Sequence, residues 1–215
     1  MSNEFLDVYD DELNLIGKMS RKEAHQKGHW HYTFHCWIIL PSSNGNHYIL
    51  FQKRHPSKEV NPGKLSISAA GHILAGETVE DGVREVKEEV GVDIPFNEMH
   101  PISEYKIILQ NEQFYNREIS LLYYTVQNLG IEDFTPQLSE VSGLFLVSID
   151  CFYQLMYGEK DKVEGLGYDL LDPKHKFLQP TFITKKHFSS KGIPYFQFVA
   201  RYLQREFTKE EAADV

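Results

Sequence analysis

The amino-acid sequence predicts an α+β fold. Aromatic and β-branched residues dominate the run Trp30–Leu40, which is typical of a strand, and Val79–Val90 has the apolar periodicity of a helix. The chain has 215 residues, of which 41% are hydrophobic and 25% are charged. That length and composition allow a sizeable hydrophobic core and exclude disordered, collagen-like and disulfide-dependent small proteins.

Local patterns predict the remaining elements in chain order. A capping-box pattern at Ser20–Glu23 favours a short helix over Glu23–Lys27. Further strands are expected at Phe5–Tyr9, Tyr48–Gln52, Leu65–Ser68, Tyr105–Leu109, Ile119–Val126 and Leu144–Val147. Further helices are expected at Ile149–Tyr157 and Pro194–Phe207, and Gly158–Gln179 is expected to be irregular.

Charge and composition exclude several classes of protein. With 22 Lys and Arg against 31 Asp and Glu, the chain carries a net charge of −9 and lacks the basic surface expected of a nucleic-acid-binding protein. No apolar run approaches the roughly 20 residues needed to cross a bilayer. The segment Met1–Phe5 lacks the features of a signal peptide. Cys36 and Cys151 lie beside large apolar residues and are predicted to be buried free thiols. We therefore expect a cytoplasmic protein that contacts neither a nucleic acid polymer nor a membrane.

The predicted helix Val79–Val90 carries two distinct stripes. One is a row of valines, and the other is formed by Glu85, Glu88 and Glu89, whose spacings of three and four residues bring side chains together on a helix. The cluster has two interpretations, an exposed acidic face or a site for a hard cation. Carboxylate oxygens are the ligands that Mg²⁺ and Mn²⁺ prefer.

The surrounding residues decide between these interpretations. Gly71, Glu77 and the run Arg84–Val92 together resemble the Nudix box, although Thr78–Val83 is one residue shorter than the family pattern. The resemblance implies a Nudix fold, with a mixed β-sheet between helices, and a hydrolase that cleaves a diphosphate linkage with Mg²⁺ or Mn²⁺. It implies metal ligation by Glu85, Glu88, Glu89 and Glu77, catalytic roles for Glu85 and Glu88, and a carboxylate-orienting role for the catalytic Arg84.

A closer resemblance, from about Glu4 to about Ser148, is to the isopentenyl-diphosphate isomerase branch of this superfamily. It rests on Gln52–Arg54, Lys58, Pro62–Gly63 and Ser68–His72. The resemblance implies a second metal site and a set of diphosphate-binding residues. The metal site would comprise His25, His31, His72 and Glu118, and the phosphate-binding residues would be Arg21, Arg54 and Lys58. The alternatives are histidines that only pack or form local hydrogen bonds, and basic residues that form an ordinary solvated surface.

Ala70 separates the chain from the isomerases. The branch has its catalytic cysteine immediately before the Gly-His pair, where this chain has Ala70, and alanine cannot exchange a proton with an alkene carbon. We therefore expect a Mg²⁺-dependent Nudix pyrophosphohydrolase acting on a nucleoside-diphosphate derivative or an isoprenoid diphosphate. An isomerase-like protein and a catalytically weak nucleotide-binding module are the alternatives. We expect one domain over residues 1–215, with a core at about 30–160 and extensions at 1–29 and 161–215. Its partner would be a small-molecule diphosphate, and a homodimer is an open alternative to a monomer.

Overall fold

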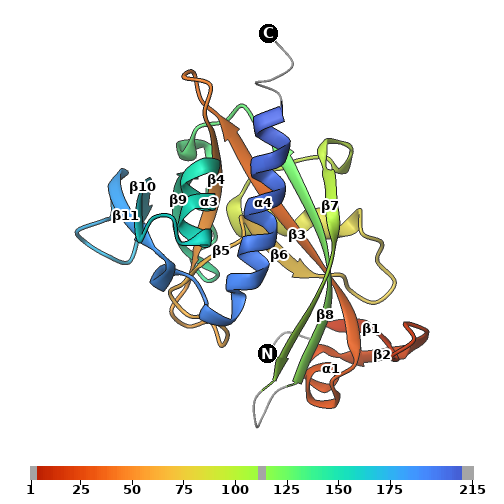
Figure 1. Ribbon diagram of the computed structural model, residues 1–215. Helices are drawn as coiled ribbons and strands as arrows, with labels where there is room; N and C mark the ends of the chain where they lie inside the picture. The colour runs from red at the N-terminus through yellow and green to blue at the C-terminus, as the bar shows by residue number, and fades with distance from the viewer. Residues whose placement is uncertain (1–3, 111–114, 210–215) are drawn as a thin grey trace. The chain divides into compact units, whose positions relative to one another are not determined.

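The computed structural model describes residues 4–110 and 115–209 (Figure 1). Contacts divide them into two compact units. Unit 1 draws its described residues from the ranges 1–36, 69–87 and 93–124, and unit 2 from 37–68, 88–92 and 125–215. The strand β3 (Trp30–Pro41) and the helix α2 (Arg84–Val90) each contribute residues to both units. The prediction of a single domain stays a prediction.

Unit 1 is built from antiparallel strand pairs and one short helix. Its strands are β1 (Phe5–Tyr9), β2 (Leu15–Ser20), the first part of β3, β6 (Ala69–His72), β7 (His100–Gln110) and β8 (Tyr115–Val126), of which the last two residues belong to unit 2. β1 pairs with β2, β6 pairs with β3 and β7 pairs with β8. The register between β3 and β6 sets Thr33 opposite His72 and Phe34 opposite Gly71. This pairing positions the Gly-His pair beside the histidine-rich part of β3.

The helix α1 (Arg21–Lys27) begins and ends at recognisable caps. The Ser20 hydroxyl accepts a hydrogen bond of 3.3 Å from the Glu23 backbone N–H, as the capping-box pattern predicts. Gly28, with a φ of 68°, ends the helix in the left-handed conformation that glycine adopts without strain. The caps leave Ala24 and His25 buried on the inner face of α1.

Unit 2 has an antiparallel sheet and two helices. The strands are β4 (His47–Arg54), β5 (Leu65–Ser66), β9 (Val141–Ser148), β10 (Lys162–Asp169) and β11 (Gln179–Thr184). In the order β11-β10-β9-β4, each strand pairs with the next, and the last residues of β3 pair with β4. The helices are α3 (Ile149–Tyr157) and α4 (Ile193–Lys209), which contact each other. No helix in the described ranges has the length and apolar character to cross a membrane.

Aromatic side chains fill the core of unit 2. Trp37 is fully buried, and its ring contacts Phe51, Phe152, Tyr195 and Phe196. The indole N–H of Trp37 donates to the Tyr195 hydroxyl at 3.3 Å, so the polar end of each ring has a partner. Burial of these rings against α3 and α4 ties the last helix of the chain to the sheet.

The predicted helix start at Val79 is wrong. Residues Asp81–Val83 form a 3-10 turn, and α2 begins only at Arg84. The backbone N–H and the hydroxyl of Thr78 both donate to one Asp81 carboxylate oxygen, at 2.8 and 2.9 Å, which favours a tight turn. Gly82 lies so close to Phe34 that a Cβ there would be 2.8 Å from the Phe34 Cβ. Close packing on β3 therefore replaces the predicted first helical turn.

The prediction that Gly158–Gln179 is irregular is also wrong, because β10 and the first residue of β11 lie in it. The segment contains Gly165 and Gly167, both on β10. In the structure they allow close packing: a Cβ on Gly167 would lie 2.3 Å from the Phe145 ring, and one on Gly165 would lie 2.8 Å from Ile183. The two thiols agree with prediction in being free, with Cys36 buried and Cys151 half-buried.

Candidate active site and histidine cluster

Arg84, the first residue of α2, joins two carboxylates in unit 1. Its Nε and Nη2 donate to the two oxygens of Glu77 at 3.2 and 3.1 Å, and its Nη1 pairs with Glu85. Nη2 also donates to the backbone carbonyl of His72 at 3.0 Å. Burial lowers the pKa of Arg84, but the contacts with Glu77 and Glu85 outweigh it and raise that pKa above its usual value. Arg84 is therefore a permanent cation that fixes both carboxylates to β6.

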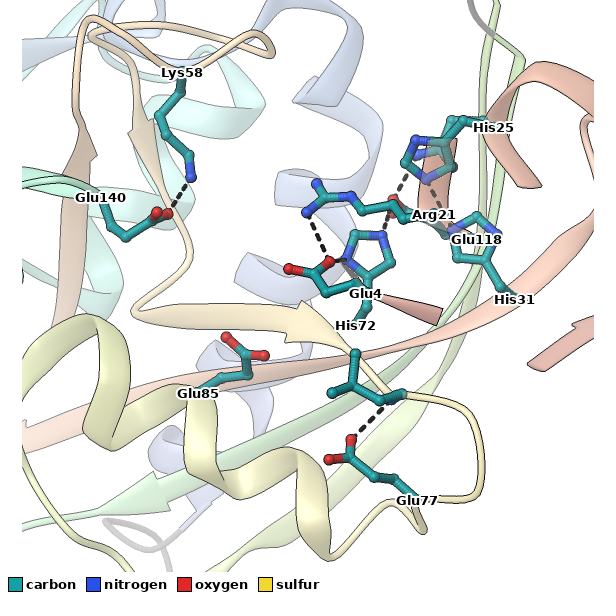
Figure 2. A network of polar contacts seen from close by, with 12 residues as sticks. Glu4, Arg21, His25, His31, Lys58, His72, Glu77, Glu85, Glu118 and Glu140 are labelled. Atoms are coloured by element: carbon teal, nitrogen blue, oxygen red, sulfur yellow. Dashed lines mark hydrogen bonds and ion pairs between the residues drawn. The ribbon is translucent and has the colours of Figure 1, made fainter. Parts of the chain in front are cut away.

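Glu77 closes the loop between β6 and the 3-10 turn. Besides its two bonds from Arg84, the Glu77 carboxylate accepts a hydrogen bond of 2.8 Å from the Leu74 backbone N–H (Figure 2). Both carboxylate oxygens of Glu77 thus accept hydrogen bonds within the described structure. In this arrangement Glu77 organises the loop, and ligation of a metal would require a further lone pair on these oxygens.

Gly71 leaves the space in which the Glu85 carboxylate lies. A Cβ built on Gly71 would be 1.9 Å from the Glu85 carboxylate carbon, a distance at which side chain and strand cannot coexist. Figure 2 shows the Glu85 carboxylate directed toward this strand. The leading glycine of the motif therefore has a steric reason, since any larger residue would push Glu85 away from β6.

The other two acids of α2 belong to unit 2 and differ in burial. Glu88 is exposed, whereas Glu89 is only 6% exposed and accepts a hydrogen bond of 2.8 Å from the Gln52 side-chain amide. Gln52, on β4, is 1% exposed, and its side-chain carbonyl oxygen has no hydrogen-bond partner in the described structure. Gln52 was not predicted as a site residue. Its signal was a lone amide in the apolar run of β4.

The predicted phosphate-binding residues have protein partners in the structure. Arg21 in unit 1 pairs with Glu4 at 3.1 Å, and in unit 2 Lys58 pairs with Glu140 (Figure 2). The Arg54 Nε, also in unit 2, donates to the backbone carbonyl of Val60 at 2.9 Å. Lys58 lies in the loop between β4 and β5, so it would have to exchange Glu140 for a phosphate oxygen.

The four residues predicted as a second metal site converge in unit 1. His25 comes from α1, His31 from β3, His72 from β6 and Glu118 from β8, and one ligand atom of each lies within 4.8 Å of the others. The Nε2 atoms of His25 and His31 are 3.3 Å apart, and His72 Nε2 is 4.0 Å from a Glu118 oxygen (Figure 2). Two ligand atoms that are each roughly 2.1 Å from one ion lie at most about 4.2 Å apart, so a group within 4.8 Å needs only a small inward shift to hold an ion.

Burial keeps these imidazoles neutral. It lowers the pKa of His25 to about 3, with His31 and Arg21 adding to the effect, and it lowers the pKa of His72 well below its usual value. The His31 pKa is lowered too, mainly by burial. The His31 Nδ1 lies 3.0 Å from the His29 carbonyl, which assigns the proton to Nδ1 and leaves the Nε2 lone pair directed at the cluster.

Two further features describe the electrostatics of the cluster. The Nε2 of His72 is buried and has no hydrogen-bond partner in the described structure. The Glu118 carboxylate, which accepts a 2.5 Å hydrogen bond from the Asn116 amide, supplies negative charge beside three neutral rings. Glu4, whose carboxylate lies 4.0 Å from His72 Nδ1, was not predicted, because only the fold brings it to the cluster. Asn116, two residues before Glu118 on β8, was not predicted either.

Comparison with known proteins identifies the family. The NUDIX domain model matches residues 29–164, which is more than half of the chain. The chain belongs to the Nudix family. An uncharacterized Nudix hydrolase of Clostridium acetobutylicum is 37% identical over 207 residues, which cover 96% of this chain and all of that protein. Nudix hydrolase 3 of Arabidopsis thaliana is 31% identical over 79% of this chain, but the chain spans only 22% of that protein.

The isomerase branch is also represented among the relatives. Isopentenyl-diphosphate Delta-isomerase 2 of Photorhabdus laumondii is 31% identical over 110 residues, covering 51% of this Nudix chain and 60% of that enzyme. A crystal structure of a Deinococcus radiodurans protein is 18% identical, with a TM-score of 0.55 over 73% of this chain and 91% of that one. At that identity the structural likeness concerns the fold alone, and with the family match it confirms the predicted α+β Nudix fold.

Proposed function

We propose that this Nudix hydrolase is a Mg²⁺- or Mn²⁺-dependent pyrophosphohydrolase that cleaves a diphosphate linkage. The observation that carries the proposal is the Arg84 bridge, which holds Glu85 against Gly71 at the start of the helix that also bears Glu88 and Glu89. Of the functions considered, this arrangement suits a hydrolase best, because clustered carboxylates on one short helix are costly without a cation.

The residues present fit a hard divalent cation. Glu85, Glu88 and Glu89 would hold it through carboxylate oxygens, the donor type that Mg²⁺ and Mn²⁺ prefer. When bound, the ion neutralises phosphate charge and lowers the pKa of a coordinated water. Arg84 maintains the position of Glu85, and Gln52 maintains that of Glu89 through its amide. Glu77 acts mainly through Arg84 in this proposal, with direct ligation as a lesser contribution.

We also propose phosphate-binding roles for basic residues of each unit. Arg54 and Lys58, from the end of β4 and the loop after it, would hold phosphate oxygens once Lys58 leaves Glu140. Arg21 would do the same in unit 1. The substrate class we propose is a nucleoside-diphosphate derivative or an isoprenoid diphosphate.

A second candidate function, diphosphate isomerisation, is favoured by one observation. His25, His31, His72 and Glu118 converge as a metal site would, and we propose that they bind a transition metal such as Zn²⁺ or Mn²⁺. Ala70 stands against isomerisation, since a methyl group cannot transfer a proton to or from an alkene. We therefore rank hydrolysis above isomerisation even if the histidine site holds metal.

A phosphate-release screen with product analysis tests the proposal. The purified chain would be incubated with Mg²⁺ and, separately, nucleotide sugars, dinucleotides, coenzyme A, nucleoside triphosphates and isoprenoid diphosphates. We expect metal-dependent phosphate or nucleotide release from at least one class, and none in chelator. Conversion of isopentenyl to dimethylallyl diphosphate without phosphate release would replace hydrolysis by isomerisation. Binding of nucleotides without any turnover would contradict both enzymatic functions.

A further inference from the structure

Unit 2 contains a basic pocket that shares no residue with the sites described so far. It has a volume of about 310 Å³ and is lined by Gly158, Lys160, Asp161, Thr184, Lys185 and Lys186. Three lysines face one aspartate in a chain whose net charge is −9, so the local charge is opposite to that of the whole molecule. A volume near 300 Å³ is at the small end of the range for ligand sites.

The backbone around the pocket fixes where the lysines lie. β10 and β11 pair so that Lys162 is opposite Thr184, at the point where β11 ends. A 3-10 turn, Lys185–His187, follows directly, and the Thr184 backbone N–H donates to the His187 Nδ1 at 3.0 Å. The turn therefore starts with two consecutive lysines at the pocket. Across from it, the αL glycine Gly158 ends α3, and a Cβ there would be 3.5 Å from the Lys185 Nζ.

More positive charge adjoins the pocket than its lining alone supplies. The Lys64 ammonium donates to the backbone carbonyl of Lys186 at 2.7 Å, and the Lys162 ammonium lies over the Phe182 ring at 4.4 Å from its centroid. Among the described residues, no carboxylate forms an ion pair with Lys160, Lys185 or Lys186. Three ammonium groups around one concave surface repel one another, and an anion bound there would relieve that repulsion.

We propose that this pocket binds the phosphate groups of a small molecule. Lys160, Lys185 and Lys186 would supply ammonium donors. The Thr184 hydroxyl, which lies 3.2 Å from the His187 Nδ1, would have to turn from that ring to supply a neutral donor. A concave site of this size fits one or two phosphate groups, whereas a nucleic acid polymer would need a longer basic track. The Asp161 carboxylate lies in the same lining and would repel a phosphate, so binding requires the three ammonium groups to outweigh it. The proposal does not depend on the hydrolase activity, because none of these residues belongs to α2 or to the histidine cluster.

Titration of inorganic diphosphate into the metal-free full chain, in the presence of chelator, tests this site. Calorimetry would compare wild type with the double variant Lys185→Ala/Lys186→Ala, and with the charge-matched control Lys174→Ala/Lys176→Ala, whose exposed lysines lie outside the pocket lining. We expect the pocket variant to bind at least about tenfold more weakly and the control to stay within about twofold. Binding should weaken as salt rises.

A second variant and a second measurement distinguish loss of the site from misfolding of the double variant. Lys160→Ala changes an exposed side chain outside the 3-10 turn and should weaken diphosphate binding by about threefold or more. In wild type, diphosphate should shift the amide resonances of Gly158 and Thr184. Equal losses in the pocket and control variants, or shifts confined to the loop of Arg54 and Lys58, would overturn the proposal. So would a single-stranded oligonucleotide that binds this surface more tightly than diphosphate.

Discussion

The buried His35 side chain makes the stability of the folded state depend on pH. Its imidazole is 6% exposed, lies 3.3 Å from the Thr33 hydroxyl, and has a pKa lowered to about 3 by burial. An unfolded histidine has a pKa of about 6.5. Because protonation is easier in the unfolded chain, the folded state has its full stability above about pH 6.5 and loses it as the pH falls toward 3.

This difference predicts the size of an acid effect. Between pH 7 and pH 5, one such histidine should lower the free energy of unfolding by about 2 kcal/mol. Urea unfolding at both pH values would be compared for wild type and His35→Gln, which removes the titrating ring. We expect the loss between pH 7 and pH 5 to be about 2 kcal/mol smaller in His35→Gln. An identical loss in both proteins would show that His35 is accessible to protons in the folded state.

Residue spacing pointed to some residues of the candidate site and missed others. Glu85, Glu88 and Glu89 were found because a helix turns local spacing into proximity. Gln52 was missed because it lies on β4 and donates to Glu89 on α2, a contact that no sequence spacing marks. Asn116 was missed because its position two residues before Glu118 is not a recognised motif. A buried amide in an apolar strand is a signal that could have identified Gln52.

At the scale of elements, the histidine cluster depends on four segments that are distant in sequence. α1, β3, β6 and β8 each supply one side chain, and the antiparallel register of β3 with β6 brings His31 and His72 together. A resemblance suggested these residues, but only the pairing of the strands explains why they meet. Alternation along β3 also separates His31, Thr33 and His35 from Tyr32 and Phe34, which face the opposite side.

Metal content tests whether the cluster is a site. After dialysis against Zn²⁺ or Mn²⁺, elemental analysis would compare wild type with His31→Ala and with His100→Ala, which alters an exposed histidine on β7. We expect His31→Ala to lose at least about tenfold in affinity for the transition metal, and His100→Ala to retain it. Equal metal content in wild type and His31→Ala would support the interpretation in which these histidines only pack.

Element boundaries were predicted correctly where local sequence signals alone determine them. The strand Phe5–Tyr9 and the helix Ile149–Tyr157 have the predicted bounds, because each has apolar periodicity and the helix has a serine cap and a glycine stop. The prediction failed at α2, where Gly82 packs on Phe34, and at β10, where glycines permit close strand packing. In both places the glycine is needed for close packing against a residue that is distant in sequence, and this contact cannot be recognised from the sequence.

At the scale of the whole molecule, charge is unevenly distributed. The chain has a net charge of −9, yet the two proposed anion-binding regions of unit 2, the Arg54–Lys58 loop and the basic pocket, are both lysine- or arginine-bearing. The family match ends at residue 164, so Thr184, Lys185 and Lys186 lie outside it. Gly158, Lys160 and Asp161 lie inside the match, so the family model covers only one side of the basic pocket.

The central claim is that the acids of α2 support metal-dependent hydrolysis. Its most direct test is the rate of phosphate release at saturating Mg²⁺ for wild type, Glu88→Gln and the matched control Glu80→Gln, an exposed glutamate before α2. Glu88→Gln keeps the side-chain shape but removes an anionic ligand, so the rate should fall at least about tenfold, while Glu80→Gln stays within about twofold. Circular dichroism should show both variants folded, since both side chains are exposed. Full turnover by Glu88→Gln, or by wild type in chelator, would contradict the claim.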